Sequence, residues 1–331
     1  MSKVKVAIIG LGSWGECHLE AFRSLPQVEV VAICDVREEL VRQLGEAYSI
    51  PDVYTNADEL LNRDDVDLVS VVTYENSHYD PTVKALQSGK HVLVEKPVAT
   101  NVRESIAMWQ TAKEHGRLLV PGHVLRFDPQ YAEARHMLQS GRLGKPVSIY
   151  LRRARPRALF ETYQRTHTVF ELTVNDLDIA IWYAGSEVKS VKAYGRSVMG
   201  ADVPDLVWAC LEFANGALAV IENHWLTPNE ANIIMADSVE VVAEQGIIGF
   251  EVQHAGLQTW SGQGRDTSAL HIHLNRNGRV SGALKEELGY LCDCILSGED
   301  PVQTSIGDAI QGIKVAEAII ESIRTGREIK L

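Results

Sequence analysis

Long apolar runs, paired cysteines and an excess of positive charge are all missing from this 331-residue sequence. No apolar run could cross a bilayer, and the N-terminus leads directly into a predicted strand without a signal-peptide pattern. The five cysteines are odd in number and scattered, which excludes a disulfide framework. The net charge of −12 argues against a general nucleic-acid or anionic-membrane surface. These absences predict a cytoplasmic protein with reduced thiols and neither a membrane nor a nucleic-acid partner.

The remaining composition is that of an ordinary globular protein, with 45% hydrophobic and 23% charged residues. No internal repeat and no low-complexity segment interrupts it. Because 331 residues exceed the usual size of a single core, the length predicts two domains.

The N-terminal stretch combines a strand, a glycine turn and a helix. Val4–Ile9 is a β-branched apolar run, typical of a strand buried on both faces. Gly10, Gly12 and Gly15 follow in G-x-G-x-x-G spacing. Such glycines allow a tight turn, a close backbone approach to a pyrophosphate, and close packing of helix on strand, respectively. The helix predicted after them would present its N-terminal N–H groups to phosphates.

A second apolar run, Val28–Cys34, ends in Asp35, twenty residues after Gly15. An acidic side chain at this place accepts hydrogen bonds from the adenosine ribose. A plain surface turn is the alternative, and Asp35 argues against it. The predicted cofactor contacts in this part are Gly10, Leu11, Gly12, Ser13, Trp14, Gly15, Asp35 and Arg37.

The chain changes character along its length. Predicted strands alternate with helices up to about residue 121, which indicates βαβ units and a parallel sheet. Later strands are separated by turns such as Asn215–Gly216, which favours antiparallel pairing. The fold class is therefore α/β. We expect a doubly wound Rossmann domain over 1–121, then an α+β domain over 122–331 with a large, mostly antiparallel, open-faced sheet. Its last helices are expected to pack back on the first domain.

Glu95-Lys96-Pro97 follows the predicted fifth strand of the parallel sheet. Ligands of such sheets lie at the carboxyl ends of the strands. A lysine there can exchange protons with a substrate hydroxyl, and a cis Pro97 would fix its direction. Taken alone, the triplet is better explained as a surface Glu–Lys pair in a strand-to-helix loop.

Several motifs together resemble the Gfo/Idh/MocA oxidoreductase family (glucose–fructose oxidoreductase, inositol dehydrogenase and relatives). They are the glycine turn, Asp35, Thr73 with His78, Glu95-Lys96-Pro97, and Gly122-His123-x-x-Arg126-Phe127. The resemblance implies a nicotinamide cofactor, a sugar, cyclitol or related polyol substrate, and oligomers formed through the second sheet. It places Thr73, Tyr74, His78, Glu95, Lys96 and Pro97 beside the cofactor. It also implies substrate contacts from Lys96, His123, Arg126, His167 and Asn175.

Two positions depart from the family pattern. Asn175 stands where the family usually carries a catalytic histidine, four residues after Glu171 on the same face of a predicted helix over 169–183. Asparagine cannot take up a proton near neutral pH. Either Lys96 is the base while Asn175 and Glu171 orient the substrate, or another group is the base. His167, Tyr163 and His123 are candidates for that group. Tyr74-Glu75 also replaces the usual Pro-Asn.

Four arginines between Arg152 and Arg157 stand out in an acidic chain. On a strand, Arg153, Arg155 and Arg157 would share one face. They could capture a substrate carboxylate or phosphate, with Arg153 the candidate, or form a solvated face or subunit contact. His271-x-His273 lacks an obvious further ligand, so we predict no metal site.

The sequence therefore predicts an oxidoreductase that uses NAD, with NADP less favoured because Asp35 would repel a 2′-phosphate. Arg37 weakens that preference. Two alternatives remain open: an NAD-dependent glycosidase and a non-catalytic NAD-binding sensor. A homodimer or homotetramer through the C-terminal sheet is expected.

Overall fold

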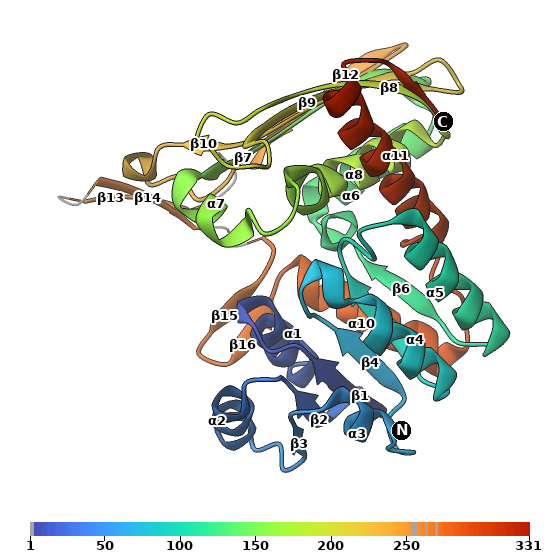
Figure 1. Cartoon of the computed structure of the whole chain (residues 1–331), viewed down its shortest axis with the longest axis vertical. Coiled ribbons are helices and arrows are strands. Elements are labelled where there is room, and N and C mark those ends of the chain that lie inside the picture. Colours follow the sequence, from blue (N-terminus) through green and yellow to red (C-terminus); the bar gives the residue numbers. More distant parts are fainter. Residues whose placement is uncertain (1–2, 253–256, 262–263, 269–270) are drawn as a thin grey trace. The chain divides into compact units, whose positions relative to one another are not determined.

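The computed structural model describes residues 3–252, 257–261, 264–268 and 271–331. The chain divides into two compact units, each drawn in Figure 1. The first unit comprises residues 1–127 and 271–310, and the second comprises 128–270 and 311–331.

The first unit is built on a six-stranded sheet in the order β3-β2-β1-β4-β5-β6, with every pair parallel. Its strands are β1 (Val4–Ile9), β2 (Val28–Cys34), β3 (Val53–Tyr54), β4 (Leu68–Val71), β5 (His91–Glu95) and β6 (Leu119–Gly122). Because β1 pairs with both β2 and β4, the strand order reverses there, and ligands of such sheets bind at this switch point.

Helices flank these strands, as the alternation in the sequence predicts. They are α1 (Ser13–Arg23), α2 (Glu38–Tyr48), α3 (Ala57–Leu61), α4 (Tyr79–Gln87), α5 (Val102–Glu114) and the later α10 (Ala283–Ser297). Short 3₁₀ turns, η1 (Glu75–Ser77) and η2 (Val124–Phe127), follow β4 and β6. A hairpin of β15 (Leu274–Arg276) and β16 (Arg279–Ser281) precedes α10. Leu284 and Leu288 of α10 share a core cluster with Leu19 and Phe22 of α1, so this late helix completes the first unit.

The second unit contains a seven-stranded sheet in the order β12-β11-β7-β10-β9-β8-β17. Its strands are β7 (Pro146–Pro156), β8 (Val188–Arg196), β9 (Leu206–Phe213), β10 (Leu218–Thr227), β11 (Ala236–Ala243), β12 (Gly246–Glu251) and β17 (Ile329–Lys330). Only β7 and β10 pair in parallel within it. Strands β13 (Leu257–Ser261) and β14 (Gly264–Ser268) form a separate hairpin.

One face of this second sheet is covered and the other is open. Along β9, Val207, Ala209 and Leu211 are buried, whereas Trp208 and Cys210 are exposed. The helices of the unit lie on one side of the sheet (Figure 1). They are α6 (Pro129–Gln139), α7 (Arg157–Tyr163), the π-helical η3 (Val169–Thr173), α8 (Val174–Ala184) and α11 (Ile306–Thr325); a further 3₁₀ turn, η4 (Asn229–Ala231), follows β10. The structure thus confirms the predicted α/β class with a large, mostly antiparallel second sheet.

Two local predictions need correction. The helix expected over 169–183 begins with a π turn and becomes α-helical only at Val174. Arg157 does not continue the strand of Arg153 and Arg155, because Pro156 caps α7 and Arg157 is its first residue. No helix among the described residues combines the length and apolarity needed to span a membrane.

Candidate active site

The glycine turn joins β1 to α1, and two of its three glycines have a steric reason within the protein. Gly10 has φ +95°, and a Cβ there would lie 2.5 Å from the carbonyl oxygen of Val72. A Cβ on Gly15 would lie 2.0 Å from the carbonyl oxygen of Gly10. A Cβ on Gly12 would instead meet no atom within 4 Å. Gly10 and Gly15 are therefore required by the fold itself, whereas Gly12 faces open space at the start of α1.

Helix α1 begins without a side-chain cap, because Gly12 is its N-cap residue. The first N–H groups of the helix consequently have no side-chain acceptor and can serve an anion. Ser13 and Trp14 are its first residues. Open space at Gly12 and uncapped N–H groups together fit a pyrophosphate.

Asp35 immediately follows β2 and is only 7% exposed. Its carboxylate accepts hydrogen bonds from the backbone N–H of Leu11 at 2.8 Å and from the backbone and guanidinium of Arg37. Burial alone would raise the pKa of Asp35, but these hydrogen bonds outweigh burial and lower it. The group is therefore an anion beside the glycine turn, as a ribose-binding acid requires, with Arg37 lying across it.

The loop after β4 carries Thr73, Tyr74 and His78. Tyr74 is 65% exposed, whereas His78 is buried. The His78 ring nitrogens lie 2.8 Å from the carbonyl oxygen of Pro97 and 3.0 Å from that of Thr73. Burial lowers the pKa of His78 despite these two acceptors. His78 thus ties the loop after β4 to the turn after β5.

Glu95 is the last residue of β5, and Lys96 and Pro97 form the turn after it. The Lys96–Pro97 bond is cis, as expected. The backbone N–H of Lys96 donates to Glu95 Oε2 at 3.1 Å. Glu95 itself is 5% exposed, whereas Lys96 is only partly buried. The turn therefore combines a buried carboxylate with a lysine that is only partly buried.

His18 is a buried partner of Glu95 that the sequence motifs do not include. Its ring contacts the side chains of both Ser70 and Glu95 from the inward face of α1. The sequence contains one indication of this role: His18 lies four residues before Phe22, so its imidazole falls on the apolar face of α1.

His123 and Arg126 lie after β6. Both side chains are buried. Arg126 donates to the carbonyl oxygen of Gln303 at 3.1 Å and to the carboxylate of Asp308 at 2.8 Å. This geometry makes Arg126 an anchor for the start of α11 within the first unit, which is a structural use of a residue predicted to bind substrate.

In the second unit, the predicted residues gather around the π turn. Asn175 Nδ2 donates to the carbonyl oxygens of Glu171 and Leu172 at 3.1 and 3.2 Å. The Glu171 side chain is 9% exposed. His167 Nδ1 accepts the N–H of Val169 at 3.2 Å, and burial lowers the His167 pKa to about 4. Its imidazole is consequently neutral near pH 7, with the proton on Nε2. Tyr163, the other candidate base in this unit, stacks on Trp225 at 5.5 Å.

Arg153 lies in a buried ionic cluster rather than on a solvated face. It donates to Asp176 of α8 at 2.8 Å and to Asp237 of β11 at 2.7 Å, and Arg155 also binds Asp237. Asn223 of β10 donates to the same Asp176 at 2.6 Å. The Arg153 side chain is 4% exposed. Its guanidinium therefore joins the helix to the sheet.

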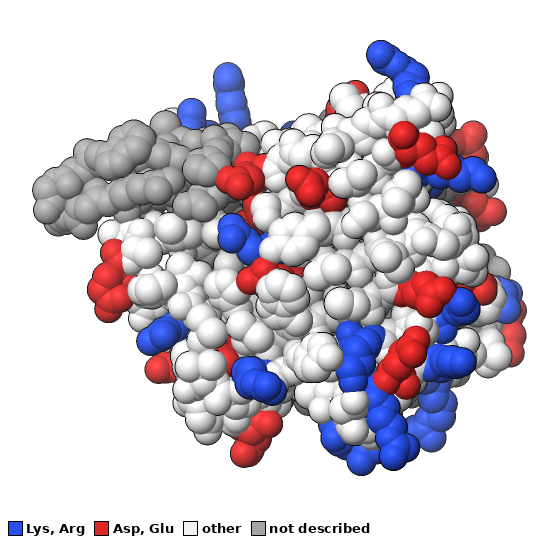
Figure 2. All heavy atoms as spheres, turned by 90° about the horizontal axis from the view of Figure 1, so that it is seen from above, with Lys and Arg blue, Asp and Glu red and all other residues white. Residues whose placement is uncertain are grey.

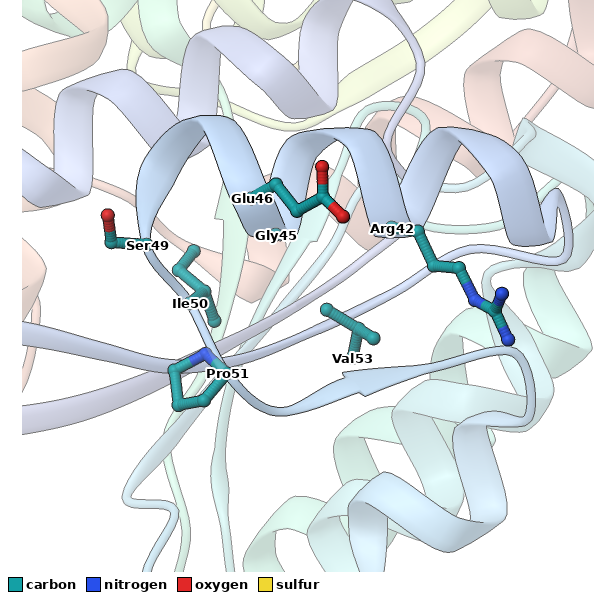
Figure 3. A pocket seen from close by; sticks show the side chains of 7 residues that line it. All are labelled: Arg42, Gly45, Glu46, Ser49, Ile50, Pro51 and Val53. Carbon is teal, nitrogen blue, oxygen red and sulfur yellow. The ribbon is translucent and has the colours of Figure 1, made fainter.

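A shallow pocket of about 520 Å³ lies elsewhere in the first unit, between the end of α2 and β3 (Figure 3). It is lined by Arg42, Gly45, Glu46, Ser49, Ile50, Pro51 and Val53. None of these is a predicted site residue. Among the described residues no group of three or more metal-binding side chains occurs, and His273 instead pairs with Glu20 at 2.8 Å.

Comparison with known proteins places the chain in a family. Residues 4–123 match the family described as "Oxidoreductase family, NAD-binding Rossmann fold", and residues 131–249 match the "GFO/IDH/MocA C-terminal domain". The chain is 30% identical to the scyllo-inositol 2-dehydrogenase (NAD(+)) of Bacillus subtilis, over 99% of this chain and 96% of that protein. It is 27% identical to the myo-inositol 2-dehydrogenase of Thermotoga maritima, over 99% and 98%.

A solved structure shows the same fold. The scyllo-inositol dehydrogenase from Lactobacillus casei, with bound NAD(H) and scyllo-inositol, superposes with a TM-score of 0.85 over 99% of both chains at 19% identity. Both halves of the sequence thus match one family, which confirms the resemblance drawn from the motifs. The chain belongs to the Gfo/Idh/MocA family of NAD-binding oxidoreductases.

Proposed function

We propose that this protein oxidises a secondary alcohol of an inositol or related polyol with NAD, and that Lys96 takes up the hydroxyl proton. The observation that carries the proposal is the position of Lys96, directly after β5 at the carboxyl edge of the parallel sheet. The glycine turn leaves β1 at the same edge. Two relatives that match 99% of the chain, at 30% and 27% identity, are inositol 2-dehydrogenases, which favours a cyclitol as substrate.

The cofactor supplies the hydride acceptor when it is bound. The chain's own residues bind and orient: the turn from Gly10 to Gly15 would hold the pyrophosphate, and Asp35 the adenosine ribose. Leu11, Arg37, Thr73, Tyr74 and Pro97 would border the cofactor. Because Asp35 is an anion, it would repel a 2′-phosphate and favour NAD over NADP.

Lys96 is suited to proton transfer by its surroundings. Glu95 lies next to it as a buried carboxylate, since hydrogen bonds from His18 and Trp14 outweigh the effect of burial and lower the pKa of Glu95. This carboxylate accepts the backbone N–H of Lys96 at 3.1 Å and so fixes the turn from which the amine extends. General-base catalysis of this kind contributes about 10²- to 10⁴-fold.

Asn175 has a different task from that of a histidine. Both hydrogens of its amide face backbone carbonyls of the π turn, so Oδ1 is the atom it can offer to a substrate. The opposite amide orientation would set Oδ1 against two carbonyl oxygens. We therefore assign Asn175 the role of accepting a hydrogen bond from a substrate hydroxyl without removing its proton. His167, with Nδ1 engaged, would donate from Nε2, and Glu171 would orient the substrate.

The open face of the second sheet supports assembly into a homodimer or homotetramer. Tyr194 and Trp208 are cross-strand neighbours that are 55% and 40% exposed, and Leu218 is 53% exposed. Seen from above, uncharged residues cover much of the view, with charged residues scattered among them (Figure 2). Exposed apolar patches of this kind mark interaction surfaces.

Turnover assays with purified protein, NAD and a panel of myo-inositol, scyllo-inositol, sugars and aryl glycosides test the proposal. Net NADH formed with a polyol supports it. Release of phenol from an aryl glycoside without net NADH would establish the glycosidase instead. NAD binding without either product would contradict catalysis and identify a sensor.

A further inference from the structure

His18 is a fully buried imidazole, at 0% exposure, on the helix that begins at the glycine turn. Its Nδ1 lies 3.1 Å from Ser70 Oγ on β4, and its Nε2 lies 3.1 Å from Glu95 Oε1 at the end of β5. The rings of Trp14 and Phe22 flank it at 5.8 and 6.3 Å. One side chain thus connects three elements of the first unit.

The protons in this cluster can be assigned from its partners. Glu95 is a carboxylate, as argued above, and a carboxylate can only accept hydrogen bonds. His18 Nε2 must therefore carry a proton and donate it toward Oε1. The other ring nitrogen, Nδ1, is hydrogen-bonded to Ser70 Oγ on β4 at 3.1 Å. The order Ser–His–Glu resembles that of a hydrolase, but Ser70 is 0% exposed, which excludes it as a nucleophile for a substrate.

Glu95 is fixed from several directions. Oε1 faces His18, Oε2 accepts the N–H of Lys96 at 3.1 Å, and Trp14 also hydrogen-bonds the carboxylate. A Cβ on Gly122 would approach Oε1 to 2.8 Å, so the β6 backbone closes the remaining side. Trp14 and His18 both belong to α1, whose N-terminus is the expected pyrophosphate site.

We propose that His18 is a positioning residue for the reaction: its Nε2–H holds the Glu95 carboxylate, and through Glu95 it fixes the turn that carries Lys96. The proposal rests on the proposed role of Lys96. The hydrogen bond from His18 to Glu95 would thus connect α1, the helix expected to bind the cofactor, to the turn that carries the Lys96 amine.

Two amide substitutions separate this role from mere packing. In His18→Gln, the amide nitrogen can occupy the place of Nε2 and still donate to Glu95. In His18→Asn, the shorter amide reaches toward Ser70 and leaves Glu95 without its donor. With NAD and scyllo-inositol or myo-inositol, we expect kcat within about fivefold of wild type for the first and a loss of about 100-fold for the second, as for a misplaced reacting group. The NAD dissociation constant should change by less than tenfold in both.

Lys96→Ala and the double variant His18→Asn/Lys96→Ala complete the design. If His18 acts through Lys96, kcat of the double variant should be little lower than kcat of Lys96→Ala alone. Equal kcat values for the Gln and Asn variants, or fully multiplicative losses in the double variant, would overturn the proposal. An unchanged rate in Lys96→Ala alone would instead refute the proposed function.

Nitrogen-15 NMR of labelled histidine in the cofactor-free protein gives a readout independent of turnover. The His18 signals should show a protonated Nε2, the nitrogen that faces Glu95. A proton on Nδ1 alone would place the Nε2 lone pair against a carboxylate and contradict the assignment.

Discussion

The two units hold their functional groups by different means. In the first, the site depends on backbone sterics: Gly15 has no room for a Cβ, and Gly10 adopts a positive φ. In the second, side chains from distant segments hold the helix of Asn175 against the sheet, with Arg153 at the centre. The first arrangement is expected to tolerate almost no change of residue type, whereas the second should fail when charge balance is lost.

Replacing Arg153 by Met is the most severe test of this contrast. It leaves the buried carboxylate of Asp176 without its arginine partner and removes one of the two arginines that bind Asp237, and breaking a buried ion pair typically costs about 3–5 kcal/mol. Denaturant unfolding should show the loss as a lower midpoint. Arg324→Met removes an exposed pair with Glu321 and should leave the midpoint unchanged. Equal unfolding midpoints for the two variants would show that the ionic cluster around Arg153 does not stabilise the second unit.

Gly15→Ala and Gly12→Ala distinguish a steric role from a cofactor-binding role within the first unit. Gly15→Ala forces a Cβ against the Gly10 carbonyl and should cost about 1–3 kcal/mol of stability. Gly12→Ala meets no protein atom, so its thermal midpoint should equal that of wild type while its NAD affinity falls at least about tenfold. A Gly12→Ala protein that binds NAD normally in calorimetry would show that the pyrophosphate lies elsewhere.

Asn175→Asp tests the second unit at its candidate site. The change sets a carboxylate oxygen against the carbonyls of Glu171 and Leu172, and we expect a loss of about 1–2 kcal/mol in thermal or denaturant unfolding. Asn76→Asp is the matched control, because the exposed Asn76 side chain already acts as an acceptor, from Ser77. If both variants have wild-type stability, the amide is not engaged by the π turn.

The smallest effect is a pH dependence from His167. Its folded pKa of about 4 lies below the unfolded value of 6.5, so the unfolded chain binds more protons between these values. The contribution to stability is complete above pH 6.5 and decreases as the pH falls toward 4, by about 1 kcal/mol at a partly exposed ring. In His167→Asn, the unfolding midpoint measured from pH 7 to 4 should fall less steeply. If the unfolding midpoints of wild type and His167→Asn decrease equally with pH, His167 is more exposed to solvent than the structure indicates.

The sequence alone allows a prediction of those candidate site residues that short-range patterns identify. The glycines, Asp35 and the turn at Lys96 follow from spacing and from strand ends, because each needs only neighbouring residues to be recognised. The role of Arg153 could not be found in this way, since its partners lie 23 and 84 residues away in the chain. The π turn depends on tertiary packing, and His18 reads as one polar residue on an apolar helix face. Arg126 matched a motif, yet its partners, Gln303 and Asp308, come from the far end of the sequence.

In the proposed reaction, Lys96 exchanges the substrate proton beside a cofactor held by the first unit. The most direct measurement compares kcat for NADH formation in wild type and Lys96→Ala, at saturating NAD and the best polyol of the panel. We predict a loss of at least about 100-fold with an NAD dissociation constant within tenfold of wild type. A Lys96→Ala enzyme that turns over at the wild-type rate would contradict the claim.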